Sequence, residues 1–516
     1  MSNIPSKLEY FKTRYRRAYS IALQWASIQE ACYHYCIPSR DLYYYTNQTQ
    51  GSQKNVKVFD TTGISATNKF VSKVQDALTP PQQTWALLEA GDDIPEEMKE
   101  KVNKYLQDTT NKIFNYIRHS NFDLAVNECY YDLAIGTAVL QINEGPDEDP
   151  LQFHSIPLAQ ACFEESINGF IESAYRTWGE VRIQELKIMW PNAVLPQWIE
   201  SAFESDPNAS VKSLYEGVVY VLGDAKPYKY VLWIDSDILL EEESTSSPWV
   251  IFRWSKTNNE VMGRGPIMNA LPALLSLNEI FRLELTSANL NVCKPLMAYS
   301  DGIFNPWTFK LEPNTVIPIS PNSGGQPPII PFPDTANPNF EQLVVVDLRQ
   351  QINALMYADP LGPIDAPTKT ATELALRQKS LAEEIGPLFT RLQQEFLSRV
   401  IQRIIHILQI KGLLEPLTLD NGKEIKVRYQ SPLVVAQGKQ DVMGLMDYFA
   451  ALQAIFQENA LMYIDPVKVP LWIAEKLGVD KNLIPEKERL EEFAKNASEQ
   501  DQTADMQMLE QGAIPQ

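Results

Sequence analysis

The sequence predicts an α+β protein that is built in several parts. Its 516 residues correspond to about three domains at roughly 150 residues per domain, so the chain can bury a sizeable core. The region 151–262 consists of short runs rich in β-branched and aromatic residues, which indicates strands. The regions before and after it repeat apolar residues every three to four positions, which indicates amphipathic helices. Together these patterns predict an antiparallel sheet region with helical regions on both sides of it.

Three helical segments are expected in the first third of the chain. They cover residues 7–34, 65–78 and about 95–140. Thr79-Pro80-Pro81 ends the second segment and Gly145-Pro146 ends the third, because proline cannot continue a helix. The first segment begins with a cluster of cations: Lys7, Lys12, Arg14, Arg16 and Arg17. These cations either form a solvated face or anchor the helix to an acidic neighbour.

The middle of the chain is expected to form antiparallel strands. Turn sequences separate the candidate strands, and Asn168-Gly169 is a typical hairpin turn. One helix is expected to interrupt the strands at 179–190, where Pro191 ends it. The expected strands are 151–156, 161–164, 169–177, 214–222, 229–234 and 249–254.

Two long helices are expected on either side of a small β module. The first begins at Pro266 and runs to about residue 291 with a continuous apolar stripe. The second begins after Asn337-Pro338 and runs to about Ala358. Between them, residues 292–337 are rich in Pro, Asn and Gly and contain short strand-like runs.

A loop and a long helix are expected next. Three prolines and one glycine within 358–367 exclude regular structure there. Thr370-Ala371-Thr372-Glu373 has the spacing of a capping box, and the helix that it begins should run to Gly412 with a kink at Gly386 and Pro387. A strand at 423–429, helical residues 438–478 and a polar tail from Glu486 complete the chain.

The composition excludes several classes of protein. The formal net charge of −20 argues against broad adhesion to nucleic acid, because binding phosphates takes clustered Lys and Arg. Five scattered cysteines are too few for a disulfide framework, so a reducing cytoplasm fits best. We expect neither a cleaved signal peptide nor a membrane span, because no run approaches about 18 apolar residues.

The sequence contains no strong catalytic motif. Phosphate-binding glycine loops, the nucleophile elbow and the zinc-protease helix motif are all missing, and the four histidines are dispersed. The tract from Cys32 to Cys36 resembles a metal site, but zinc needs about four ligands, and helix packing explains the two thiols better. Acidic pairs either are solvated faces or bind a divalent cation. They are Asp92-Asp93, Glu96-Glu97, Glu164-Glu165, Asp235 with Asp237, and Glu241-Glu242-Glu243. We therefore expect no cofactor and no metal. If the acidic pairs do bind a cation, the alternative interpretation is a cytoplasmic multidomain metal-dependent enzyme with its site at such an acidic cluster.

Several segments resemble the portal, or head-to-tail connector, proteins of short-tailed, T7-like bacteriophages. No single segment is specific, but their order along residues 65–440 is that of the family, as is the order of helix, β insertion, helix, loop and long kinked helix. The segments are Leu78-Thr79-Pro80-Pro81 with Trp85, Tyr131 to Ala138, Arg253-Trp254, Gly263-Arg264-Gly265-Pro266, Ala270-Leu271-Pro272, Asp301-Gly302, Thr370 to Glu373, and Tyr429 to Leu433. Another phage or scaffold-like assembly protein with a similar order of helices is a further alternative.

The resemblance implies an elongated fold with a helical stem, a small β clip, an α/β wing and a helical crown, assembled as a ring. The expected parts are a wing region at 1–265, stem helices at 266–291 and 338–357, a clip at 292–337, a tunnel loop at 358–368, a long kinked helix and return strand at 369–437, a crown at 438–500 and a flexible tail at 501–516. The ring would be a dodecamer in the virion, at the capsid vertex where head and tail join, and it would assemble in the host cytoplasm. It would act as a conduit for packaging and ejection of the genome, without an active site.

The resemblance also implies partners. They are the major capsid and scaffolding proteins, the terminase large subunit, tail adaptor or tube proteins, internal core proteins, and double-stranded DNA that passes through the channel. No membrane is implied. Twelve such chains would carry a charge of roughly −240, and a negative wall would let DNA slide because it offers few phosphate-binding cations.

The expected functional residues fall into three groups. The tunnel loop group narrows the channel and comprises Asp359, Pro360, Leu361, Gly362, Pro363, Asp365 and Lys369. The polar face of the stem, which faces the lumen or a groove, comprises Arg282, Asp347, Arg349, Gln350 and Asn353. Gly386 and Pro387 form the kink of the long helix.

Overall fold

The structure is a computed structural model, and it describes eleven stretches of the chain. These are residues 7–40, 58–91, 96–234, 236–292, 296–298, 329–331, 338–358, 388–415, 425–429, 432–456 and 468–477. The chain divides into two compact units. The first unit comprises Met1–Ala22, Val71–Arg264 and Pro360–Gln516, and the second comprises Leu23–Phe70 and Gly265–Asp359.

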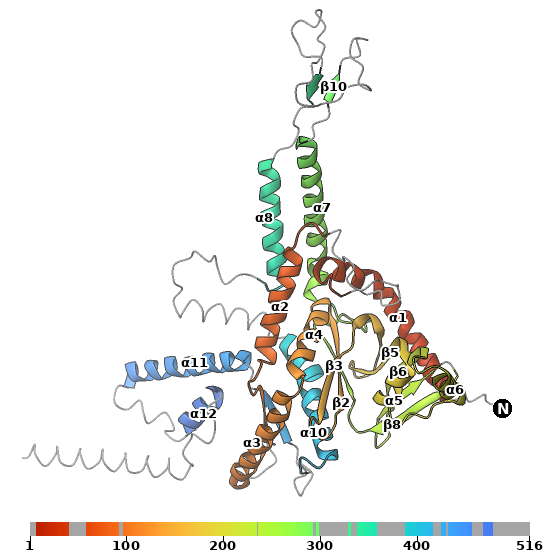
Figure 1. Ribbon diagram of the computed structural model, residues 1–516. Helices are drawn as coiled ribbons and strands as arrows, with labels where there is room; N and C mark the ends of the chain where they lie inside the picture. Colours follow the sequence, from red (N-terminus) through yellow and green to blue (C-terminus); the bar gives the residue numbers. More distant parts are fainter. Residues whose placement is uncertain are drawn as a thin grey trace, which may run out of the picture. The chain divides into compact units, whose positions relative to one another are not determined.

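The first unit contains a five-stranded antiparallel sheet in which sequence neighbours pair (Figure 1). Its strands are β4 (Ala161–Glu165), β5 (Ile171–Arg182), β6 (Ser210–Tyr220), β7 (Tyr228–Trp233) and β8 (Ile238–Ser244). Alternating side chains of β7 supply two different cores. Val231 and Trp233 pack with Phe11 and Ala18 from helix α1 (Lys7–Cys36). Leu232 packs instead with residues of helices α5 (Ile183–Met189) and α6 (Gln197–Ser205), so the sheet is covered on both faces.

A three-stranded antiparallel sheet forms the second core of the same unit. Strand β2 (Thr137–Glu144) lies between β3 (Leu151–Ser155) and β9 (Trp249–Arg253). The first six residues of β2 are buried, because helices α4 (Phe122–Ile135) and α10 (Ser398–Ile410) both pack on this strand. A π-helical turn, η2 (Gln393–Leu397), precedes α10 directly and contacts β9.

The other elements of the first unit extend these cores. Strand β1 (Ala86–Ala90) pairs antiparallel with β12 (Ile425–Tyr429), and α3 (Glu96–His119) packs on β1. The remaining elements are the 3-10 turn η1 (Leu158–Gln160) and the helices α11 (Pro432–Phe456) and α12 (Lys468–Leu477), which pack on each other.

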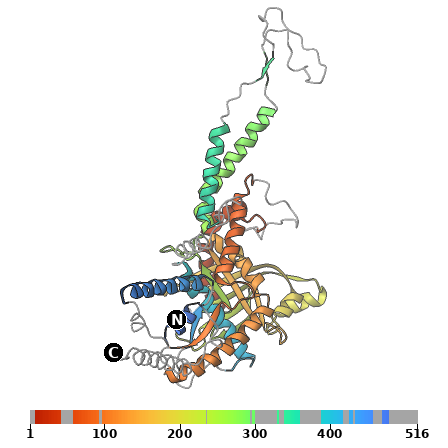
Figure 2. The ribbon, with the colours of Figure 1, turned by 90° about the vertical axis from the view of Figure 1, so that its left-hand side faces the viewer.

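The second unit is built around two long helices. Helices α7 (Pro266–Val292) and α8 (Pro338–Leu355) run side by side in both views (Figures 1 and 2). The short strands β10 (Leu296–Ala298) and β11 (Ile329–Pro331) pair antiparallel within the segment that connects them. Helix α2 (Thr62–Leu78) begins in this unit.

Most of the predicted elements are confirmed. The helices predicted at 7–34, 65–78, 266–291 and 338–358 correspond to α1, α2, α7 and α8, and each of the six predicted strands is present within a few residues of its expected bounds. Antiparallel pairing is confirmed throughout. The tunnel loop residues and the kink at Gly386 and Pro387 lie outside the described residues, as does the capping box.

Two predicted helices are wrong in part. The helical segment expected over 95–140 stops at Ile135, and β2 follows after Gly136. A strand that is buried on both faces has no alternation, so its apolar run is not separable from a helix by period alone. The helix expected at 179–190 begins only at Ile183, because Glu180, Val181 and Arg182 continue β5 with alternate residues exposed, buried and exposed.

Other elements were not predicted. Strand β1, helix α6 and strand β8 are all absent from the expectations, and α11 begins at Pro432 rather than at 438. Strand β8 contains Glu241, Glu242 and Glu243 and therefore looked like a solvated acidic run; it is the edge strand of its sheet, where charged residues are tolerated. Within the described part of the chain, no helix is long and apolar enough to cross a membrane.

Two glycines meet where α4, β2 and the chain after β9 come together. The amide of Gly136 donates to the carbonyl of Asp132 and ends α4, and the carbonyl of Gly136 accepts from Trp254 at 2.9 Å. The amide of Gly263 donates to the Thr137 hydroxyl at 2.8 Å. A Cβ atom on Gly136 would overlap the carbonyl group of Gly263, so this backbone contact requires glycine.

We expect Gly136→Ala to lower the free energy of unfolding of the first unit by about 3 kcal/mol, because two backbones would have to separate. Gly179→Ala is the matched control, since a Cβ atom there meets nothing within 4 Å. Chemical unfolding followed by tryptophan fluorescence measures both variants. Equal unfolding midpoints for the two variants would contradict the proposed requirement.

Candidate functional site

The polar residues predicted on the face of the two long helices lie in two kinds of environment. Asp347 and Gln350 are exposed on α8, whereas Val345 and Ile352 of the same helix are buried. Arg282 on α7 forms an exposed ion pair with Glu279 one turn earlier, with 2.6 Å between Nη2 and Oε1. The hydrogen bond from Arg282 lowers the pKa of Glu279. These residues present a mixed but mostly acidic and neutral surface.

Arg349 is held by another part of the second unit. Its Nη2 atom lies 2.8 Å from Oδ2 of Asp60, and its guanidinium carbon lies 5.0 Å from the centre of the Phe281 ring. The side-chain amide of Asn353 donates to the backbone carbonyl of Arg349 at 2.9 Å. The structure thus gives Arg349 a partner that sequence reasoning missed. No sequence signal indicated this pair, because the predicted helix begins at residue 65 and Asp60 is too far from that start to be a capping residue.

The two long helices expose large apolar side chains. Leu283 and Leu285 on α7 are 53% and 55% exposed, and Val346 on α8 is 53% exposed. Leu283 and Leu285 are two residues apart and therefore point about 200° apart around the helix axis. Val346 and Leu355 are nine residues apart and point about 180° apart. The pair of helices therefore has uncovered apolar flanks on more than one side.

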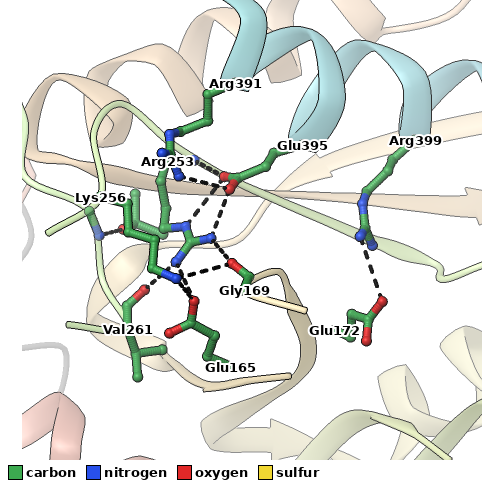
Figure 3. A network of polar contacts seen from close by, with 11 residues as sticks. Glu165, Gly169, Glu172, Arg253, Lys256, Val261, Arg391, Glu395 and Arg399 are labelled. Atoms are coloured by element: carbon green, nitrogen blue, oxygen red, sulfur yellow. Dashed lines mark hydrogen bonds and ion pairs between the residues drawn. The ribbon is translucent and has the colours of Figure 1, made fainter. Parts of the chain in front are cut away.

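A network of charged residues surrounds Arg253 in the first unit (Figure 3). The Arg253 side chain is fully buried and its Nη2 atom lies 2.7 Å from Oε1 of Glu395, which is 4% exposed. The other carboxylate oxygen of Glu395 accepts from the backbone amide of Arg253 at 3.0 Å. Arg391 lies 3.4 Å from the same carboxylate. Arg253 and Glu395 thus form a buried ion pair, and both the guanidinium and the carboxylate have hydrogen-bond partners in place of water.

The same guanidinium joins three further segments. It donates to the carbonyl of Gly169 at 2.7 Å and to that of Val261 at 3.1 Å. It also lies 3.5 Å from Glu165, and Lys256 contacts both Glu165 and the Gly169 carbonyl. Arg253 therefore connects β9, the β4–β5 hairpin, the chain after β9 and the π-turn (Figure 3). The π-turn that carries Glu395 is a rare irregularity in a helix, and such turns are frequent at functional sites.

The basic start of α1 is an anchor to an acidic neighbour. The Arg14 Nε atom donates to Glu164 on β4 at 2.7 Å, and Lys7 lies 2.6 Å from Glu241 on β8. The Tyr15 hydroxyl lies 2.7 Å from that of Thr177, beside these contacts. The sequence left open whether these cations form a solvated face or anchor the helix to an acidic neighbour. Arg14 and Lys7 anchor it.

Most described acidic pairs are engaged by cations of the chain itself. Glu164 contacts Arg14, Glu165 contacts Lys256 and Arg253, and Glu243 lies 3.3 Å from Lys229. Within the residues that the structure describes, no group of three or more His, Cys, Asp or Glu side chains is arranged to hold a metal ion. Cys32 and Cys36 are buried, and burial raises the pKa of Cys36 to about 12, so this thiol is protonated at neutral pH and packs as an apolar group.

A family model and two sequence relatives match nearly the whole chain. A family model described as bacteriophage head to tail connecting protein matches residues 9–484. The portal protein of Salmonella phage epsilon15 is 24% identical over 497 residues, which cover 89% of this chain and 86% of the relative. The probable portal protein of Bordetella phage BPP-1 is 22% identical over 535 residues, with coverages of 95% and 91%. A solved structure described as the neck of an empty GTA particle, computed with C6 symmetry, has a TM-score of 0.40 and 12% identity over 83% of this chain and 95% of that chain.

We expect Glu395→Gln to lower the free energy of unfolding of the first unit by about 3 kcal/mol, because the buried Arg253 would lose its nearer anionic partner and keep Glu165 at 3.5 Å. The exposed pair gives the control, and Glu279→Gln should leave the unfolding midpoint unchanged. Unfolding in guanidinium chloride, followed by circular dichroism, measures both. A stability of Glu395→Gln equal to that of the parent would show that Arg253 does not need the charge of Glu395.

Proposed function

This chain belongs to the family of bacteriophage head-to-tail connecting proteins, and from that premise we propose that copies of it form a closed ring through which a phage genome is packaged and later ejected. It is a phage portal protein. The observation that carries the proposal is the family match over residues 9–484, which leaves out only short terminal segments. The two portal relatives align over nearly their full lengths as well.

The two long helices support assembly into a ring. A closed ring uses two different surfaces on each subunit, because each copy contacts one neighbour on each side, whereas a two-fold dimer uses one surface twice. Helix α8 has Val346 and Leu355 exposed on opposite sides, and Leu283 and Leu285 of α7 diverge in the same way. Burial of these side chains against two neighbours would remove apolar area from water on both flanks.

The charge of the chain supports a passive conduit for DNA. A net charge of −20 per subunit, repeated around the ring, repels phosphates rather than binding them. Asp347 and Gln350 on α8 add no cation to this surface. The cations Arg282 and Arg349 are each paired with a carboxylate of the same unit. DNA would therefore pass with few attractive contacts to break at each step.

We assign the parts of the subunit by the order in which the corresponding parts follow one another in the portal family. Helices α7 and α8 form the stem around the channel, and residues 292–337 form the clip that meets the terminase and later the tail adaptors. Residues 358–368, with Asp359 and Asp365 but no cation before Lys369, narrow the channel. Residues 438–500 form the crown toward the capsid interior. Twelve is the number of subunits that we propose, with the capsid, scaffolding and core proteins as the other partners.

The ring itself is proposed to have no enzymatic activity. The enzyme alternative required acidic side chains free to bind a divalent cation. Glu164, Glu165, Glu241 and Glu243 all contact lysine or arginine instead. The energy for packaging would then come from a separate motor protein.

We expect the purified chain to form rings of about 700 kDa, the mass of twelve 58.6 kDa subunits. Val346→Asp and Leu355→Asp should each prevent closure, because a charge cannot be buried against a neighbour. A mixture of the two variants should stop at dimers, since each retains one intact flank. Light scattering and negative-stain imaging measure the outcome, with Leu222→Asp, at an exposed turn position of the first unit, as the control. Rings from both variants would contradict the assignment of these flanks.

Deletion of 359–366 should leave ring formation intact and reduce the retention of packaged DNA, because the segment is proposed to narrow the channel without joining subunits. Imaging tests the first expectation, and a nuclease-protection assay on filled heads tests the second. Loss of the ring in the deletion variant would place this segment at the subunit interface instead.

A further inference from the structure

A short segment before α2 contacts both long helices of the second unit. The backbone amide of Phe59 donates to Oδ1 of Asn278 on α7 at 2.7 Å, and Asn278 is 8% exposed. The next residue, Asp60, binds Arg349 on α8 with its Oδ2 atom. Phe59 and Asp60 thus connect this segment to α7 and α8, which both lie more than 200 residues later in the sequence.

Asp60 uses its two carboxylate oxygens for different tasks. Oδ1 accepts from the backbone amide of Thr62 at 2.8 Å and thereby satisfies a free donor at the start of α2. Oδ2 accepts from Nη2 of Arg349 at 2.8 Å and from Nε at 3.3 Å. The Asp60 side chain is 4% exposed, so water does not replace these bonds readily. The carboxylate therefore links the first turn of α2 directly to α8.

The packing around this link is close. A Cβ atom on Gly63 would lie 2.8 Å from Cδ2 of Leu274 on α7 and 3.1 Å from Sγ of Cys36, so the start of α2 is pressed against α7 and the end of α1. Further along α2, the ring of Phe70 lies 6.5 Å from that of Tyr357, just after α8. Helix α2 therefore packs on α7 and lies beside the residues that directly follow α8.

We propose that the Asp60–Arg349 pair is a clasp that fixes α8 relative to α2 and α7, and that Arg349 is a positioning residue of the channel wall rather than a contact for DNA. This inference rests on the proposed function. The Arg349 side chain is 43% exposed, but its charge is paired with the buried Asp60 carboxylate, so it attracts phosphates less than an unpaired cation would. The clasp also explains why an acidic conduit keeps an arginine on this helix.

The clasp and a direct DNA contact predict different mutant patterns. Asp60→Asn keeps an oxygen to accept from Thr62 but loses the charge that binds Arg349, and Arg349→Gln loses the other partner. If the pair is a clasp, both variants should raise amide exchange of residues 344–358 by about ten- to a hundredfold, as the loss of a charge-assisted hydrogen bond allows. Both should reduce DNA retention in filled heads to the same extent. The exchanged pair, Asp60→Arg with Arg349→Asp, should restore part of both properties.

Lys229→Gln, which removes the ion pairs of Lys229 with Asp224 and Glu243 in the first unit, is the control and should change neither readout. The proposal is overturned if Arg349→Gln alone reduces DNA retention while Asp60→Asn does not, or if neither variant changes exchange in 344–358. Rings are imaged in every sample. A parent protein that forms no ring would defeat the proposed function, whereas intact rings with parental exchange in both variants would defeat the clasp alone.

Discussion

The first unit depends on the burial of one guanidinium. Arg253 is fully buried, and a charge in that position is tolerated only when hydrogen bonds and an opposite charge replace water. Its partners come from the β4–β5 hairpin, the chain after β9 and the π-turn before α10, so these segments must all reach their places for any one of them to be stable there (Figure 3). The three-stranded sheet and the helices on it are thus fixed by a polar constraint as well as by apolar packing.

Sequence patterns predicted the elements with a clear period. The long helices and the half-buried strands were found because one face of each is buried, and that burial leaves a repeat of 3.6 or 2 residues. Strand β2 was mistaken for helix because it is buried on both faces and shows no alternation. Strand β8 was missed because an edge strand tolerates the acidic run from Glu241 to Glu243. These misses follow from tertiary environment, which local sequence does not contain.

The site was less predictable than the fold. Arg349 was assigned to a polar face by its helical position, but its partner Asp60 lies 289 residues earlier. The anchor role of Arg14 and the engagement of the acidic pairs likewise depend on contacts between distant segments. The prediction of a portal protein from the sequence rested instead on the order of short segments that resemble the family. Two of those segments meet in the structure, since Gly136 of one lies against Gly263 of the other.

The Arg253–Glu395 pair also constrains how the chain is made. The two residues are separated by 142 positions, and α10, which packs on β2, follows Glu395 directly. While the ribosome is still synthesising the intervening segment, Arg253 on β9 lacks the carboxylate of Glu395 and β2 lacks one of its covering helices. The first unit therefore completes its core late, after α10 has emerged as far as Ile410. Until then the strands of this core lack part of their cover, and exposed apolar strands of that kind are prone to pair with other chains and aggregate.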